Sequence, residues 1–388
     1  MNVLQICHKP PVPSRDGGCL AMNAITQGLL KHNVSVKVLS ISTPKHPFNI
    51  ELLDEKYIRS TAIESIFIDT NIHPKDALLS LFKGESYNVN RFYDAAFEKL
   101  ITAVIKNQKF NIIHLESIFV LPYLKSIRDC FKGKIVLRTH NVEHLIWKNL
   151  ALVERNPFKK KYLQTLAKQL EKYELLHLNK IDGIASISEY DSAVFEKEGC
   201  KIPIKNISFG IDVDAINSVN NEGLFFLGSL DWRPNIEGVN WLSKVANKLS
   251  QSVRIAGRNP SKKLKLSSNM ELVGPVKSAK QFMLNSGVML VPLFSGSGIR
   301  IKILEAMSWG IPVVATPKAV EGLGVVHGEQ VLITDNPVQF VNYANELLAN
   351  KSKAIRQAQN AHSFVKKNYD NQFLTEKLIS FYNQLLVK

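Results

Sequence analysis

The chain has 388 residues, of which 45% are hydrophobic and 21% are charged. This length predicts two or three domains with cores of their own, and the apolar content excludes a disordered basic tail or a small disulfide-stapled scaffold. Lys and Arg outnumber Asp and Glu by 49 to 34, a formal net charge of +15. A basic folded surface favours an anionic partner, which leaves nucleic acid, an anionic membrane leaflet and a phosphorylated substrate open.

The cysteines and the apolar stretches limit the cellular context. The four cysteines lie far apart and show no CxxC pair or metal-ligand spacing, which predicts reduced core thiols in a cytosolic protein. The first residues carry no basic segment ahead of the apolar run, so we interpret them as a strand and not as a signal peptide. Apolar stretches such as 118–124 and 288–294 are shorter than the roughly 20 residues that a spanning helix needs.

The first half of the chain alternates short β-branched runs with longer segments of helical period, the pattern of a parallel sheet covered by helices. In chain order we expect strands at 3–6, 34–41, 112–115, 134–138 and 183–186, and helices at 19–31, 92–107 and 157–179. The last helix carries an apolar stripe of Leu163, Leu166, Leu170 and Tyr173, which predicts packing on the domain. Its basic end is a candidate contact for an anionic leaflet.

The pattern breaks at 207–223, where we place the interdomain linker. Beyond it we expect strands at 224–227, 253–256, 270–272, 288–292, 313–315 and 331–333, and helices at 235–249, 279–284 and 301–309. The predicted fold class is α/β, with two Rossmann-like doubly wound domains, 1–215 and 216–370, facing a central cleft. Ligands of such sheets bind beyond the carboxyl ends of the strands, so the motifs should follow strands.

The first candidate contact is the turn after the first strand, where Gly17 and Gly18 precede a helix. Paired glycines let the backbone approach a ligand, and a helix N-terminus offers N–H groups to an anion. A tight turn without a ligand explains the same residues, because the full G-x-G-x-x-G fingerprint is absent.

A more informative segment follows the strand that ends near Pro292, because a helix there begins with two cations, Arg300 and Lys302. Cations in a first turn oppose the helix dipole, which favours a bound anion such as a diphosphate between them and the helix. A carboxylate beside a phosphate would repel it, so we expect Glu305 to accept hydrogen bonds from ribose hydroxyls. The alternative is that Arg300 and Lys302 are solvated surface charges and that Glu305 is their partner on the same helix.

Two pairs of possible metal ligands could suggest a metal site. Asp212 and Asp214 spell a D-x-D, but they lie in the predicted linker, where a solvated turn explains them. His114 and Glu116 stand two residues apart on one strand without further ligands, which favours a core strand end. We therefore predict no metal site.

The segment from Gly296 to Thr316 resembles the donor-binding segment of glycosyltransferase family 4, in a variant that reads Gly-x-Gly-x-Arg-x-Lys-x-x-Glu. The resemblance implies the GT-B fold, sugar transfer with retention of configuration, and no required metal or cofactor. Glu305 matches the second of two motif glutamates, whereas Ser297 stands at the first and departs from the pattern. Donor-binding roles are implied for the residues of this motif, Gly296, Ser297, Gly298, Ile299 and Glu305.

The resemblance extends to other loops. Gly228 and Arg233 are similar to a turn that contacts the donor diphosphate, and Gly257 lies in a loop similar to the next one. His140 matches the position of a histidine near the transferred sugar on the acceptor side. The GT-B fold also implies that a C-terminal helix in 371–388 crosses back onto the first domain.

From these residues and this resemblance we expect a retaining hexosyl- or related glycosyltransferase in cell-envelope polysaccharide or glycolipid synthesis, with His140, Arg300 and Lys302 as catalytic residues. Its partners would be a nucleotide-diphosphate sugar and a glycan or lipid-linked acceptor. A GT-B nucleotide-sugar epimerase and a basic nucleic-acid-binding protein are the alternatives, the latter without a recognised nucleic-acid motif. We expect a cytoplasmic protein, with the inner face of the cytoplasmic membrane as a candidate docking surface.

Overall fold

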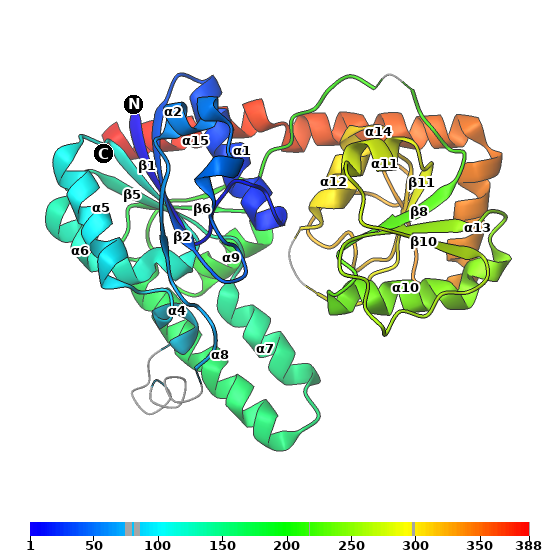
Figure 1. Ribbon diagram of the computed structural model, residues 1–388, viewed down its shortest axis with the longest axis horizontal. Helices are drawn as coiled ribbons and strands as arrows, with labels where there is room; N and C mark the ends of the chain where they lie inside the picture. The colour runs from blue at the N-terminus through cyan, green and yellow to red at the C-terminus, as the bar shows by residue number, and fades with distance from the viewer. Residues whose placement is uncertain (74–79, 81–85, 217, 297–298, 388) are drawn as a thin grey trace. The chain divides into compact units, whose positions relative to one another are not determined.

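The computed structural model describes residues 1–387 except 74–79, 81–85, 217 and 297–298 (Figure 1). The chain forms two compact units: unit 1 consists of Met1–Gly210 with Asn371–Lys388, and unit 2 of Ile211–Asp370. The sequence places the boundary at residue 215, a few residues further along the chain. Each unit has a parallel sheet covered by helices, so the predicted α/β class is confirmed.

Within the described residues, the sheet of unit 1 has seven parallel strands in the order β3-β2-β1-β4-β5-β6-β7. The strands are β1 (Asn2–Cys7), β2 (Ser35–Ser42), β3 (Glu64–Phe67), β4 (Ile112–Glu116), β5 (Lys134–Arg138), β6 (Gly183–Ser186) and β7 (Ile204–Asn206). Side chains of β1 alternate between two core layers, with Leu4 and Ile6 in one and Val3 and Cys7 in the other. Both faces of the sheet are therefore buried.

Helices cover both faces of this sheet (Figure 1). They are α1 (Gly17–Lys31), α2 (Glu55–Thr61), α4 (Tyr87–Asn90), α5 (Ala95–Asn107), α6 (Leu124–Cys130), α7 (Glu143–Val153), α8 (Pro157–Leu178), α9 (Glu189–Lys197) and α15 (Asn371–Val387), with 3-10 turns at Ile50–Leu52 and Ile118–Tyr123. The helix predicted at 92–107 begins at Ala95 instead, because the Asp94 carboxylate accepts from the N–H groups of Ala96 and Phe97 and caps it there.

Helix α15 belongs to unit 1 although the chain reaches it only after completing unit 2. It packs on α1, where Gly28 lies against the fully buried Thr375. Further along α15, the Tyr382 hydroxyl donates to His114 Nδ1 on β4 at 2.5 Å. The last helix is thus bonded directly to β4, the central strand of the unit 1 sheet.

Among the described residues, unit 2 has six parallel strands in the order β10-β9-β8-β11-β12-β13. They are β8 (Leu224–Leu227), β9 (Val253–Ala256), β10 (Met270–Gly274), β11 (Val288–Val291), β12 (Val313–Ala315) and β13 (Leu332–Ile333). The helices are α10 (Arg233–Val245), α11 (Ala279–Leu284), α12 (Ile301–Ser308), α13 (Pro337–Ala349) and α14 (Lys351–Tyr369). Helix α10 ends at Val245 and continues as a 3-10 turn, Ala246–Lys248, so the helix predicted to reach 249 is shorter than expected.

All four cysteines are free thiols, two of them buried and two half-buried, which agrees with the predicted reduced core thiols. In the part of the chain that the structure describes, no helix combines the length and the apolar character needed to cross a bilayer.

We expect Gly28→Ala to lower the free energy of unfolding by about 1–3 kcal/mol, although Ala favours a helix, because the methyl group would overlap Thr375 Oγ1 and lie 3.1 Å from Thr375 Cβ. In a Thr375→Ala background the same change should destabilise the protein clearly less, because only the 3.1 Å contact with Cβ remains. Urea unfolding followed by circular dichroism measures both. An equal cost in the two backgrounds would contradict this account of α1–α15 packing.

Candidate active site

The predicted cations of unit 2 lie where α12 begins. Arg300 is the residue just before the helix, and its guanidinium lies over the Trp232 ring at 5.6 Å. Lys302 is in the first turn and is half-buried. Burial lowers the pKa of both side chains, and the nearby Arg258 lowers that of Lys302 further. Ile299 is half-buried beside them, whereas Ser297 and Gly298 lie outside the described residues.

Glu305 follows Lys302 by three residues on the same helix, and burial raises the pKa of its carboxyl. Among the residues that the structure describes, the Lys302 ammonium has no ion-pair partner. The Glu305 charge only partly offsets the lowering of the Lys302 pKa by burial. A cation at a helix N-terminus is opposed by the dipole as well as by desolvation. An anion bound at this end of α12 would relieve both penalties at once.

Two loops of unit 2 approach each other closely at the carboxyl ends of β8 and β9. The Gly228 N–H donates to the Ala256 carbonyl at 3.0 Å, and a Cβ on Gly257 would overlap the Gly228 carbonyl. Gly296 lies against the Trp232 ring, close to the Arg300 guanidinium. These glycines therefore line the same end of the sheet as α12.

Arg233 has a different setting. It is the first residue of α10, its side chain is 88% exposed, and its Nε donates to Glu237 at 2.7 Å. The Glu237 carboxylate also accepts from Ser295 Oγ at 2.7 Å. Arg233 is thus a surface cation held by its neighbour one turn along the helix, unlike the half-buried Arg300 and Lys302.

In unit 1, Gly17 and Gly18 form the first turn of α1, but a side chain of the protein already occupies this helix end. The Asp16 carboxylate accepts from the Cys19 N–H at 3.0 Å, from Lys9 Nζ at 2.8 Å and from His46 Nε2 at 2.8 Å. Although burial acts against ionisation, the His46 and Lys9 hydrogen bonds hold the pKa of Asp16 far below its usual range. The Gly18 backbone packs against the Lys9 side chain.

His140 follows β5 and takes part in a buried polar network at the carboxyl ends of neighbouring strands. Its Nε2 lies 2.8 Å from Glu116 Oε2, at the end of β4. The fully buried Glu116 also accepts hydrogen bonds from Gln5 Nε2 at 3.0 Å, His114 Nε2 at 3.2 Å and Arg138 Nη1 at 3.2 Å. Burial would raise the pKa of Glu116, but Arg138 and the bonded histidines hold it well below its usual range.

These contacts decide the tautomer of His140. Burial lowers the pKa of the imidazole, so the ring is neutral near pH 7. An ionised carboxylate can only accept, so the proton is on Nε2 and the lone pair is on Nδ1. His140 can therefore accept a hydrogen bond from a hydroxyl group.

His8 is a second imidazole at this edge that the sequence analysis did not identify. Its ring packs edge-to-face on His140 with 5.3 Å between centroids, and its Nδ1 lies 3.0 Å from the Glu116 carbonyl oxygen. Burial and the charge of Lys9 lower its pKa well below the usual range. The position of His8, directly after the first strand, is the signal that could have found it.

Glu143 and His144, at the start of α7, lie in an acidic cluster with Glu174 and Glu198. Burial and the Glu174 charge raise the pKa of Glu143 to about 7. His144 donates from Nδ1 to Glu174 at 2.7 Å and contacts Glu198 through Nε2 at 3.1 Å. Although burial opposes it, these two carboxylates raise the pKa of His144, which favours an imidazolium that neutralises the cluster.

Two groups of described residues have spacings that a metal ion could bridge: Asp16, Cys19 and His46, and His144, Glu171 and Glu198. In the first, burial raises the pKa of the Cys19 thiol, and Asp16 is already bonded to Lys9 and His46. In the second, both His144 nitrogens are bonded to carboxylates. Both groups are accounted for by contacts within the protein. The two pairs noted in the sequence also have other settings: Asp214 is an exposed partner of Lys280, and His114 and Glu116 are buried core residues.

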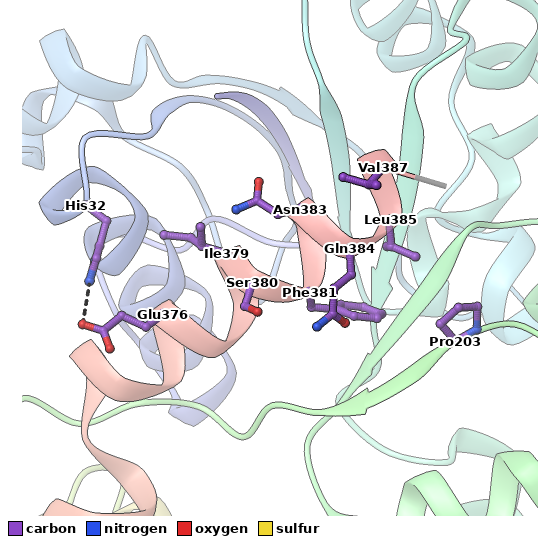
Figure 2. Close-up of a pocket in the computed structure, with 10 residues that line it drawn as sticks. All are labelled: His32, Pro203, Glu376, Ile379, Ser380, Phe381, Asn383, Gln384, Leu385 and Val387. Atoms are coloured by element: carbon purple, nitrogen blue, oxygen red, sulfur yellow. Dashed lines mark ion pairs between the residues drawn. The ribbon is translucent and has the colours of Figure 1, made fainter.

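A groove of about 880 Å³ lies along α15 in unit 1, between His32 at the end of α1 and Pro203 just before β7 (Figure 2). Figure 2 shows Glu376 paired with His32 at one end and apolar side chains such as Ile379 along the rest. This groove is at the amino-terminal edge of the sheet, opposite the edge that carries His140. It contains none of the predicted site residues.

Residues 221–350 match a family model described as glycosyl transferases group 1. An uncharacterized 44.6 kDa protein in the cps region of Klebsiella pneumoniae is 27% identical over 299 residues, which cover 69% of this chain and 72% of that one. Sucrose-phosphate synthase from Thermosynechococcus elongatus has a TM-score of 0.71 at 14% identity and covers all of both chains. Alr3699/HepE from Anabaena, solved with UDP and glucose, has a TM-score of 0.66 at 13% identity over 99% of this chain and 100% of that one.

The structural similarity over the whole chain shows that the protein has the GT-B fold, as the sequence predicted. The family match lies in unit 2 and includes Gly228, Arg233, Gly257 and the start of α12. Together, the fold and the family match support a glycosyltransferase. His140 and the turn at Gly17 lie outside the matched residues, so their roles depend on the geometry of unit 1.

We expect the free energy of unfolding of the wild-type protein to fall, relative to that of Glu143→Gln, as the pH rises from about 4.5 through about 7. A carboxyl whose pKa is raised from 4.5 to about 7 by folding binds its proton more tightly in the native state. Its contribution to the free energy of unfolding is therefore present at low pH and lost above the raised pKa. The full difference is about 3 kcal/mol. Urea unfolding between pH 5 and pH 8 measures it.

The exposed Glu51→Gln variant is the control and should keep the wild-type pH dependence. Parallel curves for wild type and Glu143→Gln would show that Glu143 titrates normally.

Proposed function

We propose that the protein is a retaining glycosyltransferase of family 4 that transfers a sugar from a nucleotide-diphosphate sugar to a hydroxyl of a glycan or lipid-linked acceptor. The observation that carries the proposal is the pair of half-buried cations, Arg300 and Lys302, at the start of α12 in the unit that matches a glycosyltransferase family. The relative in a cps region supports a role in polysaccharide synthesis.

The proposed reaction places negative charge on the departing group. The bond between the anomeric carbon and the diphosphate oxygen breaks, and the nucleotide diphosphate leaves with the electron pair. The acceptor oxygen bonds to the same face of the anomeric carbon, and its proton passes to the departing phosphate oxygen. Arg300, Lys302 and the N–H groups of α12 stabilise the charge on that phosphate, so we propose that the reaction requires no metal ion.

Glu305 is proposed to bind the ribose hydroxyls of the donor. A carboxylate is a strong acceptor for paired hydroxyls, and Glu305 lies one helical turn from the proposed phosphate contacts. Gly228, Gly257 and Gly296 would let the backbone come close to the nucleotide. These proposed nucleotide contacts all lie in unit 2.

His140 is the proposed contact of unit 1 with a sugar hydroxyl. Its neutral ring presents the Nδ1 lone pair, so it accepts a hydrogen bond and does not neutralise charge. Glu116 is a positioning residue in this account, because it holds the Nε2 proton and acts on substrate only through His140.

We expect Arg300→Ala and Lys302→Ala each to lower kcat/KM by roughly 10- to 1000-fold, as the loss of a group that stabilises transition-state charge does. The exposed Arg356→Ala and Lys351→Ala variants, on α14, are the matched controls and should retain activity. The donor is first identified by thermal shift against UDP-, GDP- and ADP-sugars, because a bound ligand raises the melting temperature. UDP-sugars come first, since a solved protein of the same fold binds UDP.

Wild-type activity in Arg300→Ala and Lys302→Ala would contradict the site. A product that forms without an acceptor and keeps the nucleotide would instead identify an epimerase, and an inverted anomeric centre in the product would exclude retention.

We expect Glu116→Gln to move the acidic limb of the pH–kcat/KM profile to lower pH. Without the carboxylate, Arg138 disfavours the imidazolium more strongly and the pKa of His140 falls further, so a lower pH is needed to protonate it and abolish its acceptor role. Nitrogen-15 NMR of the imidazole measures the same titration directly. Glu174→Gln, which removes a buried carboxylate from a different histidine, should lower stability but leave this limb in place.

The acidic limb of the Glu116→Gln profile could instead stay at the wild-type pH, with kcat/KM reduced only in proportion to the folded fraction. That result would show that Glu116 is a purely structural residue.

A further inference from the structure

Helices α7 and α8 form a hairpin that projects from the unit 1 sheet (Figure 1). The turn between them has three residues, from Glu154 to Asn156. Asn156 caps α8 by accepting from the Lys159 N–H, and Pro157 occupies the first helical position, so the turn is well defined. The end of the hairpin that carries this turn, residues 150–162, is called the hairpin tip below.

The hairpin tip exposes an unusual amount of apolar surface. Five large apolar or aromatic side chains within these residues are exposed, namely Leu150, Leu152, Val153, Phe158 and Tyr162, and Phe158 is 87% exposed. Beyond the tip, α8 buries Leu166, Ala167 and Leu170, whereas these five side chains at the tip stay exposed. Exposed apolar side chains grouped at one place indicate a contact surface.

The same tip is strongly basic. Its residues 150–162 contain four cations, Arg155, Lys159, Lys160 and Lys161, and a single carboxylate, Glu154, which pairs with Lys159 at 2.9 Å. The apolar side chains therefore lie among positive charges. This combination matches an anionic lipid surface, which accepts apolar side chains below its headgroups and cations at its phosphates.

We propose that the hairpin tip docks the protein on an anionic lipid bilayer. Leu152, Val153 and Phe158 enter the region between headgroups and acyl chains, and the lysines next to Phe158 contact lipid phosphates. A projecting tip with flexible lysines fits a fluid, negatively charged surface. A folded protein partner would instead need a pocket shaped to receive Phe158.

This docking does not depend on sugar transfer, because no residue of the hairpin tip belongs to the proposed donor or acceptor contacts. Its consequence for the proposed function is that a lipid-linked acceptor would be presented at the same surface as unit 1. Vesicle binding without substrate tests docking alone, so its failure and the failure of the proposed function are distinguishable.

The experiment measures co-sedimentation of the full chain with phosphatidylcholine vesicles and with vesicles that also contain phosphatidylglycerol. The wild-type protein is expected to bind the anionic vesicles much more tightly than the neutral ones. Phe158→Ser with Leu152→Ser should lower the partition coefficient by about tenfold or more. Lys159, Lys160 and Lys161 changed together to Gln should lower it by roughly fivefold per cation at low salt.

Matched controls separate the tip from general charge and apolarity. Val338→Ser removes an exposed apolar side chain from unit 2, and Lys262, Lys263 and Lys265 changed together to Gln remove three exposed cations there. Both controls should bind like wild type. In Phe158→Trp, the indole emission should shift to the blue and be quenched by brominated lipid on anionic vesicles only.

Several results would overturn the proposal. Two results would show that general charge drives association. One is wild-type vesicle binding by the tip variants, and the other is a loss of vesicle binding in the unit 2 lysine control equal to that of the tip lysine variant. Failure to bind either vesicle would show that lipid is not the partner. Gel filtration that shows a wild-type dimer dissociated by Phe158→Ser, without vesicle binding, would assign the hairpin tip to a second copy of the chain.

Discussion

The buried carboxylate of Glu116 organises unit 1 more than any other polar group described above. A charge without exposure to water requires compensation, and four donors on β1, β4, β5 and the loop after β5 provide it. Through His114 the network continues to Tyr382, so the last helix of the chain is bonded to the same strands. One ionised group therefore joins the core, the returning helix and the edge that carries His140.

The sequence predicted fully buried strands with accurate bounds but missed the two short edge strands of unit 1. Strands β6 and β8 have the predicted bounds because their four residues are all buried, and apolar runs are the direct signal of that burial. Strands β3 and β7 at the sheet edge were missed, since Glu64–Phe67 and Ile204–Asn206 are short and contain no fully buried residue. Their existence depends on pairing with a neighbouring strand, which a local pattern does not record.

The candidate site residues also differ in how far the sequence alone could identify them. Arg300, Lys302 and Glu305 fall within six residues, so one motif could identify them together. The network around His140 joins residues more than 100 positions apart, such as Gln5 and Glu116, and only the strand order β1-β4-β5 brings them together. Glu116 was correctly predicted to end a core strand, but its bond to His140 depends on the neighbouring strand β5.

The two units are suited to opposite kinds of partner. Cations at the start of α12 suit a group that gains negative charge, and each remains half-buried. The imidazoles of His8 and His140 in unit 1 are kept neutral by burial, with their protons held by oxygens of Glu116, so they suit an uncharged hydroxyl. A transfer from a diphosphate to a hydroxyl needs one environment of each kind. Each environment is described within its own unit. Of the excess basic residues, only the cations at the start of α12 are therefore connected to the proposed reaction.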